Sequence, residues 1–168
     1  QLTRMLRPDG ADIHLVYDAA GRLSERRLPD RTLTYTYDPV TGQRSGIASS
    51  DGQNLLFTYD GSLETATEWT GAVSGSVTRT YDADYAIASE SVNGAHSVSF
   101  AYDGDGQITG AGTLAITRDP QTAVALGTTL GDTSTTLAWN AFGELVHFSA
   151  DHSGNNLVSI AYVKDKLS

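Results

Sequence analysis

The stretch YDAAGRL at residues 17–23 is the first clear copy of a short pattern that returns along the chain. The doublet Tyr-Asp begins at positions 17, 37, 59, 81 and 102, so successive copies lie 20, 22, 22 and 21 residues apart. Weaker copies continue the series at Arg118-Asp119, Trp139-Asn140 and Tyr162. Self-similarity at a steady period of this length is the signature of a repeat protein. We therefore interpret residues 1–168 as a single array of about seven to eight repeats.

An alternating segment precedes each doublet, as in TLTYTYD at 32–38 and NLLFTYD at 54–60. In the first of these, Leu33, Tyr35 and Tyr37 share one face, and threonines occupy the other. A period of two with one apolar and one small polar side is typical of a half-buried β-strand. The same alternation recurs at Leu55, Phe57 and Tyr59, and at Val98, Phe100 and Tyr102.

A turn follows each doublet. Gly21, Gly106 and Gly143 all stand four places beyond the aromatic residue, where a positive φ can close a hairpin. The Asp side chain can accept hydrogen bonds from the backbone N–H groups just beyond it. Second turns such as LPDR and HSGNN end each unit. The sequence therefore predicts an all-β fold, a repetitive antiparallel β-hairpin meander of some fourteen to sixteen strands without helices. So wide an open sheet is expected to coil.

The doublets themselves are predicted to be architectural. Tyrosines at equivalent strand ends would form a ladder that fixes register, each cross-strand pair contributing roughly 0.2–1 kcal/mol. The residues assigned this structural role are Tyr17, Asp18, Gly21, Tyr37, Asp38, Tyr59, Asp60, Tyr81, Asp82, Tyr102, Asp103, Gly106, Asp119, Trp139, Asn140, Gly143 and Tyr162.

Charge excludes one class of partner. Residues 1–44 hold seven of the eleven basic residues, whereas residues 45–163 hold two against thirteen Asp and Glu, a net charge of −11. Such a surface repels phosphate backbones and anionic lipid, so neither nucleic acid nor membrane insertion by this segment is expected. The chain has no cysteine, which excludes disulfides and thiolate metal sites. No apolar run is long enough to span a bilayer.

YDAAGRL, and TLTYTYDPVTGQ with its proline-containing turn, resemble the RHS/YD-repeat family over residues 13–162. That family includes bacterial Rhs polymorphic toxins, the shell subunits of insecticidal Tc toxins and the extracellular teneurins. The resemblance implies a segment of a spiral β-shell, which in the bacterial members encloses a toxic C-terminal polypeptide. The family's self-cleaving DPxGL-type signature is missing, because DPVTG at 38–42 has an extra residue and DPQTA at 119–123 lacks the glycine. Both are interpreted as turns, and no catalytic residue is carried over.

Other side chains are weighed against structural roles. His147 and His152 lack companions at zinc-ligand spacing. Asp103 and Asp105 supply only part of a calcium loop. The glycines of GAVSGS at 71–76 and those from 104 to 112 are interpreted as loop glycines. A glycosidase would need two carboxylates in one cleft, for which the candidates are Glu64, Glu68, Glu90 and Glu144.

We therefore predict a non-catalytic structural segment, with no metal and no cofactor, of a secreted or cell-surface protein that delivers a toxin. The chain, which begins QLTRMLRPDG, is interpreted as an open piece of a larger shell. Its partners would be the remainder of the same shell and an enclosed C-terminal polypeptide. The alternative is a carbohydrate- or cell-surface-binding module that stacks a glycan on Trp69 or Trp139.

Overall fold

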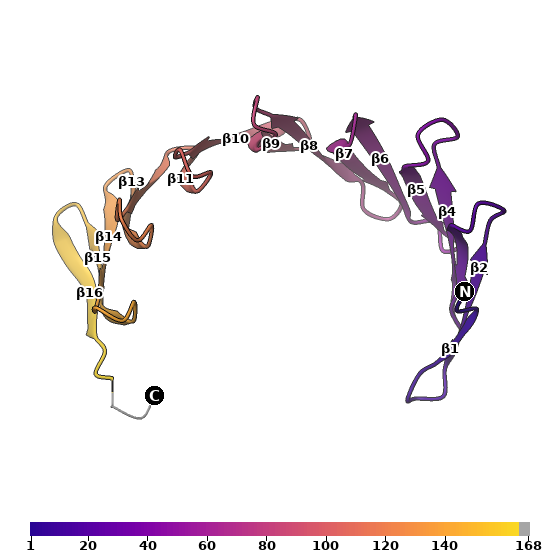
Figure 1. Ribbon diagram of the computed structural model, residues 1–168, viewed down its shortest axis with the longest axis horizontal. Helices are drawn as coiled ribbons and strands as arrows, with labels where there is room; N and C mark the ends of the chain where they lie inside the picture. The colour runs from indigo at the N-terminus through magenta and orange to yellow at the C-terminus, as the bar shows by residue number, and fades with distance from the viewer. Residues whose placement is uncertain (165–168) are drawn as a thin grey trace. The chain divides into compact units, whose positions relative to one another are not determined.

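The computed structural model describes residues 1–164. All secondary-structure elements assigned in that range are β-strands. The strand order runs from β1 to β16 in the order of the sequence, so spatial neighbours are also neighbours along the chain (Figure 1). Neighbouring strands are antiparallel, as in β1 with β2 and β15 with β16. The predicted all-β antiparallel meander is confirmed, with sixteen strands in the described range.

Contacts divide the chain into two compact units. The first comprises Gln1–Tyr85 with Glu90–Ser97, and the second comprises Ala86–Ser89 with the described residues from Val98 onward. The first unit holds β1 (Arg4–Leu6), β2 (Asp12–Tyr17), β3 (Leu23–Arg27), β4 (Thr32–Tyr37), β5 (Arg44–Ser49), β6 (Asn54–Asp60), β7 (Leu63–Thr70) and β8 (Gly75–Tyr81). Residues of both units occur in β9 (Ile87–Val92) and β10 (Ala95–Tyr102). The second unit holds β11 (Ile108–Ala111), β12 (Leu114–Arg118), β13 (Ala125–Leu130), β14 (Thr133–Trp139), β15 (Leu145–His152) and β16 (Asn155–Ala161).

The sequence pattern locates the even-numbered strands well and the first strand not at all. Tyr17, Tyr37, Tyr81 and Tyr102 are the last residues of β2, β4, β8 and β10. β1 has only three residues and lies before residue 13, where the recognisable repeats begin. The single array predicted over 1–168 stays a prediction, and its last four residues lie outside the described range.

A β-bulge lies beside the doublet in six of the strand pairs. Between β2 and β3, Val16 pairs with Glu25 and Tyr17 pairs with Leu23, so Ser24 has no residue opposite it. The same one-residue shift occurs in β4–β5, β6–β7, β10–β11, β12–β13 and β14–β15. The extra residue is always on the odd-numbered strand. A bulge bends its strand and increases the local twist, so each of these repeats carries a bend at the same place.

Glycine occupies the strand position next to the bulge in three of these pairs. These residues are Gly46, Gly110 and Gly127. A Cβ atom added to Gly127 would collide with the backbone oxygen of Thr135 on β14, so this close approach requires glycine. The prediction of loop glycines is therefore wrong for Gly110, which lies in β11, and for Gly75, which begins β8. Neighbouring glycines give both segments the composition of a loop, so the sequence alone did not indicate these strands.

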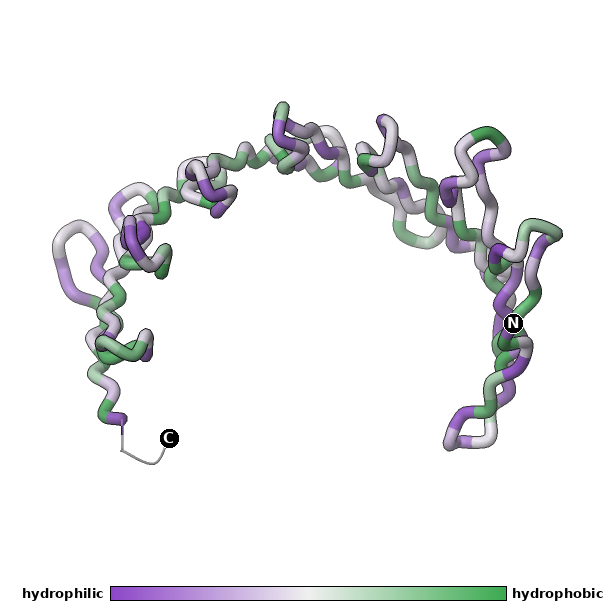
Figure 2. The backbone as a smooth tube through the Cα atoms, viewed as in Figure 1, coloured by the Kyte–Doolittle hydropathy of each residue, from purple (hydrophilic) through white to green (hydrophobic). Residues whose placement is uncertain are grey.

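Side chains alternate between two faces along the strands, and Figure 2 shows the corresponding interleaving of hydrophobic and hydrophilic residues. We call the side that carries Leu33, Tyr35 and Tyr37 the tyrosine face. Register places an apolar row on this face across four strands of the first unit. The row consists of Tyr35, Ile47, Leu55 and Trp69 on β4, β5, β6 and β7. A similar row in the second unit consists of Leu137, Phe148 and Ile160 on β14, β15 and β16.

Each unit covers its tyrosine face only in part. Ile13, 3% exposed, is the only buried hydrophobic side chain among residues 1–164, whereas Leu55 and Ile160 remain 36% and 39% exposed. The chain exposes 11288 Å², against roughly 8000 Å² expected for a compact monomer of its mass. The sheet is therefore a single layer that lacks a core of its own. Within the described residues no helix is long and apolar enough to cross a membrane.

Candidate functional site

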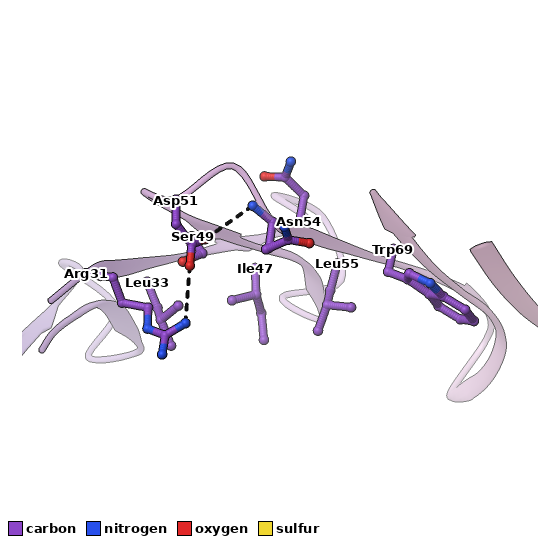
Figure 3. Close-up of a pocket in the computed structure, with 9 residues that line it drawn as sticks. Arg31, Leu33, Ile47, Ser49, Asp51, Asn54, Leu55 and Trp69 are labelled. Carbon is purple, nitrogen blue, oxygen red and sulfur yellow. Dashed lines mark hydrogen bonds and ion pairs between the residues drawn. The ribbon is translucent and has the colours of Figure 1, made fainter. Parts of the chain in front are cut away.

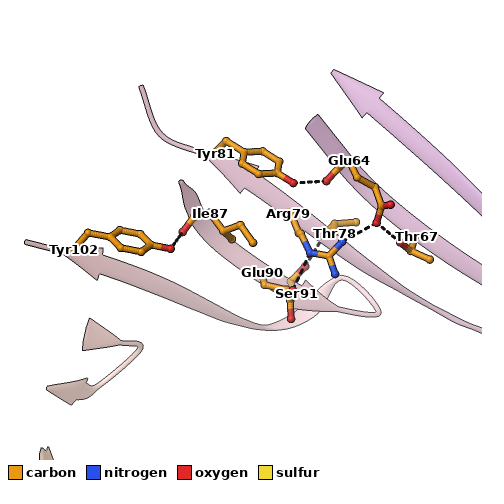
Figure 4. Close-up of polar contacts among 9 residues, drawn as sticks. All are labelled: Glu64, Thr67, Thr78, Arg79, Tyr81, Ile87, Glu90, Ser91 and Tyr102. Atoms are coloured by element: carbon orange, nitrogen blue, oxygen red, sulfur yellow. Dashed lines mark hydrogen bonds and ion pairs between the residues drawn. The ribbon is translucent and has the colours of Figure 1, made fainter. Parts of the chain in front are cut away.

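The aromatic residue at five of the repeat positions donates a hydrogen bond to a backbone oxygen 14 to 17 residues earlier in the chain. The Tyr81 hydroxyl, at the end of β8, donates a hydrogen bond to the backbone oxygen of Glu64 on β7, with 2.6 Å between the oxygens (Figure 4). The same contact joins Tyr17 to Leu2 at 2.8 Å, Tyr37 to Leu23 at 2.8 Å, Tyr102 to Ile87 at 2.8 Å and, through the indole Nε1, Trp139 to Ala125 at 2.7 Å. Each such bond closes one hairpin and contributes roughly 1 kcal/mol net.

The remaining repeat positions vary this contact. Arg118 replaces the aromatic residue at the end of β12, and its Nε donates to the backbone oxygen of Ile108 at 3.1 Å. Tyr59 lies on β6 beside the bulge of β7 and pairs with Glu64. Tyr162 follows β16, and its backbone N–H donates to the oxygen of Val146 at 2.9 Å.

The tyrosines are not spaced as neighbours in a direct ring-on-ring ladder. They stand on every second strand, so their Cα atoms are roughly 10 Å apart across the sheet, farther than the 4.5–7 Å typical of ring pairs. Arginines cover two rings of the first unit instead. The Arg22 guanidinium lies 4.4 Å from the centroid of Tyr37, and that of Arg44 lies 5.7 Å from the centroid of Tyr35. Cation–π contacts and hydroxyl bonds thus hold the aromatic side chains.

The acidic residue of a doublet organises the turn that follows. Asp103 Oδ1 accepts the backbone N–H groups of Asp105 and Gln107, at 3.0 and 2.9 Å. Asn140 Oδ1 accepts those of Phe142 and Glu144 in the same way. Asp18 Oδ1 accepts the backbone N–H of Arg22 at 2.8 Å. An amide oxygen can therefore replace the carboxylate, because the turn uses it only as an acceptor.

The two proline-containing turns share one design and differ in the residue at their positive-φ position. Asp38 Oδ1 accepts both the backbone N–H and the hydroxyl of Thr41, and Asp119 Oδ1 accepts the same two groups of Thr122. The next position takes a positive φ in both turns. It is glycine in the first, Gly42 with φ 75°, but alanine in the second, Ala123 with φ 62°. Alanine is strained in this region because its Cβ approaches the backbone.

Two further doublets have different turns. Asp60 is the last residue of β6 and pairs directly with Leu63 across a two-residue turn. Asp82 Oδ1 accepts the backbone N–H of Asp84 at 2.9 Å. Tyr85 takes the place of the turn glycine there and has a φ of 64°.

Hydrogen bonds in these turns lower the pKa of three doublet carboxylates. The pKa of Asp38 is lowered chiefly by the backbone N–H of Thr41, and that of Asp119 chiefly by the backbone N–H of Thr122. The pKa of Asp18 is lowered chiefly by the backbone N–H four residues further on. All three side chains favour the ionised form in the folded state because that form is the better acceptor.

The structure brings together two of the four candidate glycosidase carboxylates. Arg79 Nη1 lies 2.9 Å from Glu64 Oε1, and Arg79 Nε lies 3.0 Å from Glu90 Oε2 (Figure 4). The Thr67 hydroxyl also donates to Glu64 Oε1, at 2.6 Å. We call Glu64, Arg79 and Glu90 the Arg79 cluster. One guanidinium binds both carboxylates, so neither is placed to act as a free acid or base.

The other two carboxylates lie apart from this cluster. Glu68 is exposed on β7 and pairs with Leu56, on the face opposite to the tyrosines. Glu144 accepts a hydrogen bond from Asn140 Nδ2 at 2.7 Å, within the turn before β15.

The histidines contact hydroxyl groups. His147 Nε2 lies 3.0 Å from Ser159 Oγ, and His152 Nδ1 lies 3.0 Å from Thr133 Oγ1. Within residues 1–164, no group of three or more His, Cys, Asp or Glu residues could hold a metal ion.

A cavity of about 370 Å³ lies on the tyrosine face of the first unit, and we call it the β4–β7 cavity. Figure 3 shows Leu33, Ile47 and Leu55 pointing to the same side of the sheet, where they form its floor. Trp69 stands at one side. The full set of lining residues is Arg31, Leu33, Ile47, Ser49, Asp51, Gln53, Asn54, Leu55 and Trp69.

Sequence reasoning missed the Arg79 cluster, although one signal was present. Arg79 stands two places before Tyr81, where Tyr35, Phe57 and Phe100 stand in other repeats. A charged residue at a half-buried position normally has a partner of opposite charge. The structure supplies two partners.

Comparisons with known proteins agree with this fold. The crystal structure of TcdB2-TccC3-TEV superposes with a TM-score of 0.69 at 15% sequence identity, covering 96% of this chain and 10% of that chain. A Tc holotoxin pore of Photorhabdus luminescens with a mutant TccC3 gives 0.60 at 13% identity, covering 96% of this chain and 9% of that chain. These likenesses concern the fold, and this chain spans about a tenth of each matched chain. No curated protein sequence matches it.

The sequence itself matches a family description over nearly its whole length. The model of the teneurin YD-shell covers residues 1–167, which include all the doublets. The doublet spacing, the turn chemistry and the meander all fall within this match. The chain therefore belongs to the teneurin YD-shell family.

Proposed function

We propose that this chain is a non-catalytic wall segment of a shell that encloses a polypeptide attached to the same protein. One observation carries the proposal: the described strands pair in a sheet with no second layer over its apolar face, so residues on that face such as Leu55 and Ile160 stay partly exposed in each unit. Contiguous exposed apolar surface on a soluble protein normally marks an interaction site. Membership of the YD-shell family supports the same role.

The geometry suits containment. Within each unit, consecutive antiparallel pairing places backbone hydrogen bonds between neighbouring strands, so each unit offers few gaps. The tyrosine face presents side chains such as Leu55, Phe57 and Ile160, which favour unfolded or partly folded cargo because such cargo exposes hydrophobic groups. The remainder of the shell would pair with the outer strands, since unpaired strand edges invite association.

The proposal excludes catalysis by this segment, and the Arg79 cluster supports that exclusion. Glu64 and Glu90 are both bound by Arg79, whereas a glycosidase requires one carboxylic acid and one free carboxylate on either side of a sugar. Secretion or surface display is part of the proposal, supported by the likeness to a Tc holotoxin pore. Nucleic acid is not a proposed partner, because residues 45–163 are strongly acidic.

Protease protection in the full-length protein tests containment. The enclosed polypeptide should resist cleavage while the wall is folded and become sensitive at the denaturant concentration that unfolds the wall. Amide exchange should find the protected polypeptide lacking a native core. A polypeptide that is cleaved equally fast before and after the wall unfolds would contradict the proposal.

Glycan binding is the second candidate, favoured by Trp69 beside the polar groups of Asp51, Gln53 and Asn54. The Trp139 indole is less available, because its Nε1 already donates to the backbone of Ala125. A glycan array separates the candidates. Specific binding that is lost on Trp69→Ala and kept on Trp139→Ala would support the binding module.

A further inference from the structure

We propose that the β4–β7 cavity receives one large, uncharged apolar side chain from the enclosed polypeptide. This inference rests on the proposed containment function and adds a specific contact to it. The cavity measures about 370 Å³, whereas an apolar cavity of roughly 150 Å³ is sufficient for a benzene ring. It therefore has room for a leucine, methionine or phenylalanine side chain.

The floor of the cavity is aliphatic. Leu33, Ile47 and Leu55 come from three successive strands and point to the same side (Figure 3). Ile47 and Leu55 are direct cross-strand partners, so register sets their spacing. Leu55 remains 36% exposed, which leaves apolar area that a partner can cover. Covering it would be favourable because apolar surface would be removed from water.

Trp69 favours an apolar occupant over a sugar. A Cβ atom added to Gly75 would lie 2.5 Å from Trp69 Cζ2, so the indole packs closely against the β8 backbone. That contact occupies part of the ring surface on which a sugar would stack. The ring therefore forms one side of the cavity, next to aliphatic side chains. Among the described residues, the cavity has no second aromatic ring on which a sugar could stack.

Charge at the rim selects an uncharged group. Arg31 Nη1 lies 3.2 Å from Asp51 Oδ2, and Arg31 Nε lies 3.3 Å from Asp30 Oδ2. The three groups sum to a net charge of −1, but Arg31 is already paired with both carboxylates, so no unpaired ion complements a charged side chain that enters between them. The amide groups of Gln53 and Asn54 also line the cavity and can bind the backbone of an extended peptide.

Site-specific photo-crosslinking in the full-length protein tests the inference. A benzophenone amino acid at Leu55 reports on the cavity, and the same probe at Leu56 is the matched control. Leu56 is adjacent in sequence, 50% exposed, and on the opposite face of β6. We expect several-fold more crosslinked product from Leu55, joined to a large apolar residue of the enclosed polypeptide, as mapped by peptide mass spectrometry.

Three outcomes would overturn the cavity assignment: equal crosslinking from Leu55 and Leu56, a crosslink between two copies of the chain in an isotope-labelled mixture, or a crosslinked mass that belongs to a glycan. A further probe at Ile160, on the tyrosine face of the second unit, distinguishes the two proposals. Crosslinks to the enclosed polypeptide from Ile160 but not from Leu55 would refute the cavity assignment and leave containment standing. Failure at both positions would count against containment itself.

Discussion

The hydroxyl of Tyr37 and the backbone oxygen of Leu23 lie 2.8 Å apart across the β3–β4 hairpin. Tyr37→Phe removes this donor and leaves a part-buried carbonyl without its partner. We expect the free energy of unfolding to fall by about 1–2 kcal/mol, measured by chemical denaturation. Tyr85→Phe is the control, because the Tyr85 side chain is 74% exposed. Equal effects of the two substitutions would contradict a specific role for the Tyr37 hydroxyl.

Ala123→Gly should stabilise the protein. The φ of 62° at Ala123 is a left-handed conformation that costs an L-residue energy and glycine very little. We expect a gain of about 0.5–1 kcal/mol after the greater freedom of glycine in the unfolded chain is subtracted. The reciprocal variant Gly42→Ala should destabilise the equivalent turn. Thermal unfolding of the two variants measures these changes in stability. Melting temperatures that shift in the same direction would contradict the shared turn design.

Gly127→Ala should be among the most damaging single-methyl additions to the wall. The new Cβ would collide with the backbone of Thr135, which cannot rotate away as a side chain can. The expected loss is about 1–3 kcal/mol. Gly104→Ala is the matched control, because a Cβ there meets nothing within 4 Å and its φ is not positive. A wall that tolerates both changes equally would not have the close β13–β14 approach described above.

Acid should weaken the proline-containing turns. The folded pKa values of Asp38 and Asp119 lie below the ordinary value of 3.8. Their contribution to stability is therefore present above about pH 4 and is lost as the pH falls through the folded pKa values. The double substitution Asp38→Asn and Asp119→Asn should reduce the loss of stability at acid pH. The turns should remain, because Asn140 accepts backbone hydrogen bonds in its own turn with an amide oxygen. Denaturation midpoints from neutral to acid pH measure the effect, and an unchanged acid slope in the double variant would refute it.

Arg79→Met should destabilise the β7–β9 region by leaving Glu64 and Glu90 close together without a cation. With Arg79 24% exposed, we expect a loss of about 1–2 kcal/mol. Adding Glu64→Gln and Glu90→Gln removes the repulsion and should recover part of the loss. Urea denaturation of the single and triple variants is the measurement, and a triple variant no more stable than the single one would argue against the charge explanation.

The sequence predicts the periodic part of this structure because the residues that form each strand and each turn lie close together within one repeat. Alternation before Tyr37 predicts a strand, and Asp38 with Pro39 predicts the turn that ends it. Features that depend on two strands at once were not predictable. The bulge at Ser24 depends on how β3 pairs with β2. Glycine is required at Gly127 because the backbone of β14 approaches it closely.

The contacts between side chains and backbone were harder still to foresee. A tyrosine at a strand end can pack against a ring or donate its hydroxyl, and only the pairing partner decides which occurs. Because the doublets lie on alternate strands, the ring of Tyr37 meets Arg22 and its hydroxyl meets the Leu23 carbonyl. Alternation alone shows neither the strand order nor the distance between equivalent residues.

The reach of the tyrosine hydroxyl bonds has an evolutionary consequence. The donor and acceptor residues are only 14, 15 or 17 positions apart in sequence, less than one repeat period. Duplication of one repeat would supply both the donor and the acceptor of its hydroxyl bond. Deletion of one repeat would remove both and leave neither group without its partner. Gene duplication could thus lengthen or shorten such a protein by whole hairpins without a compensating mutation elsewhere.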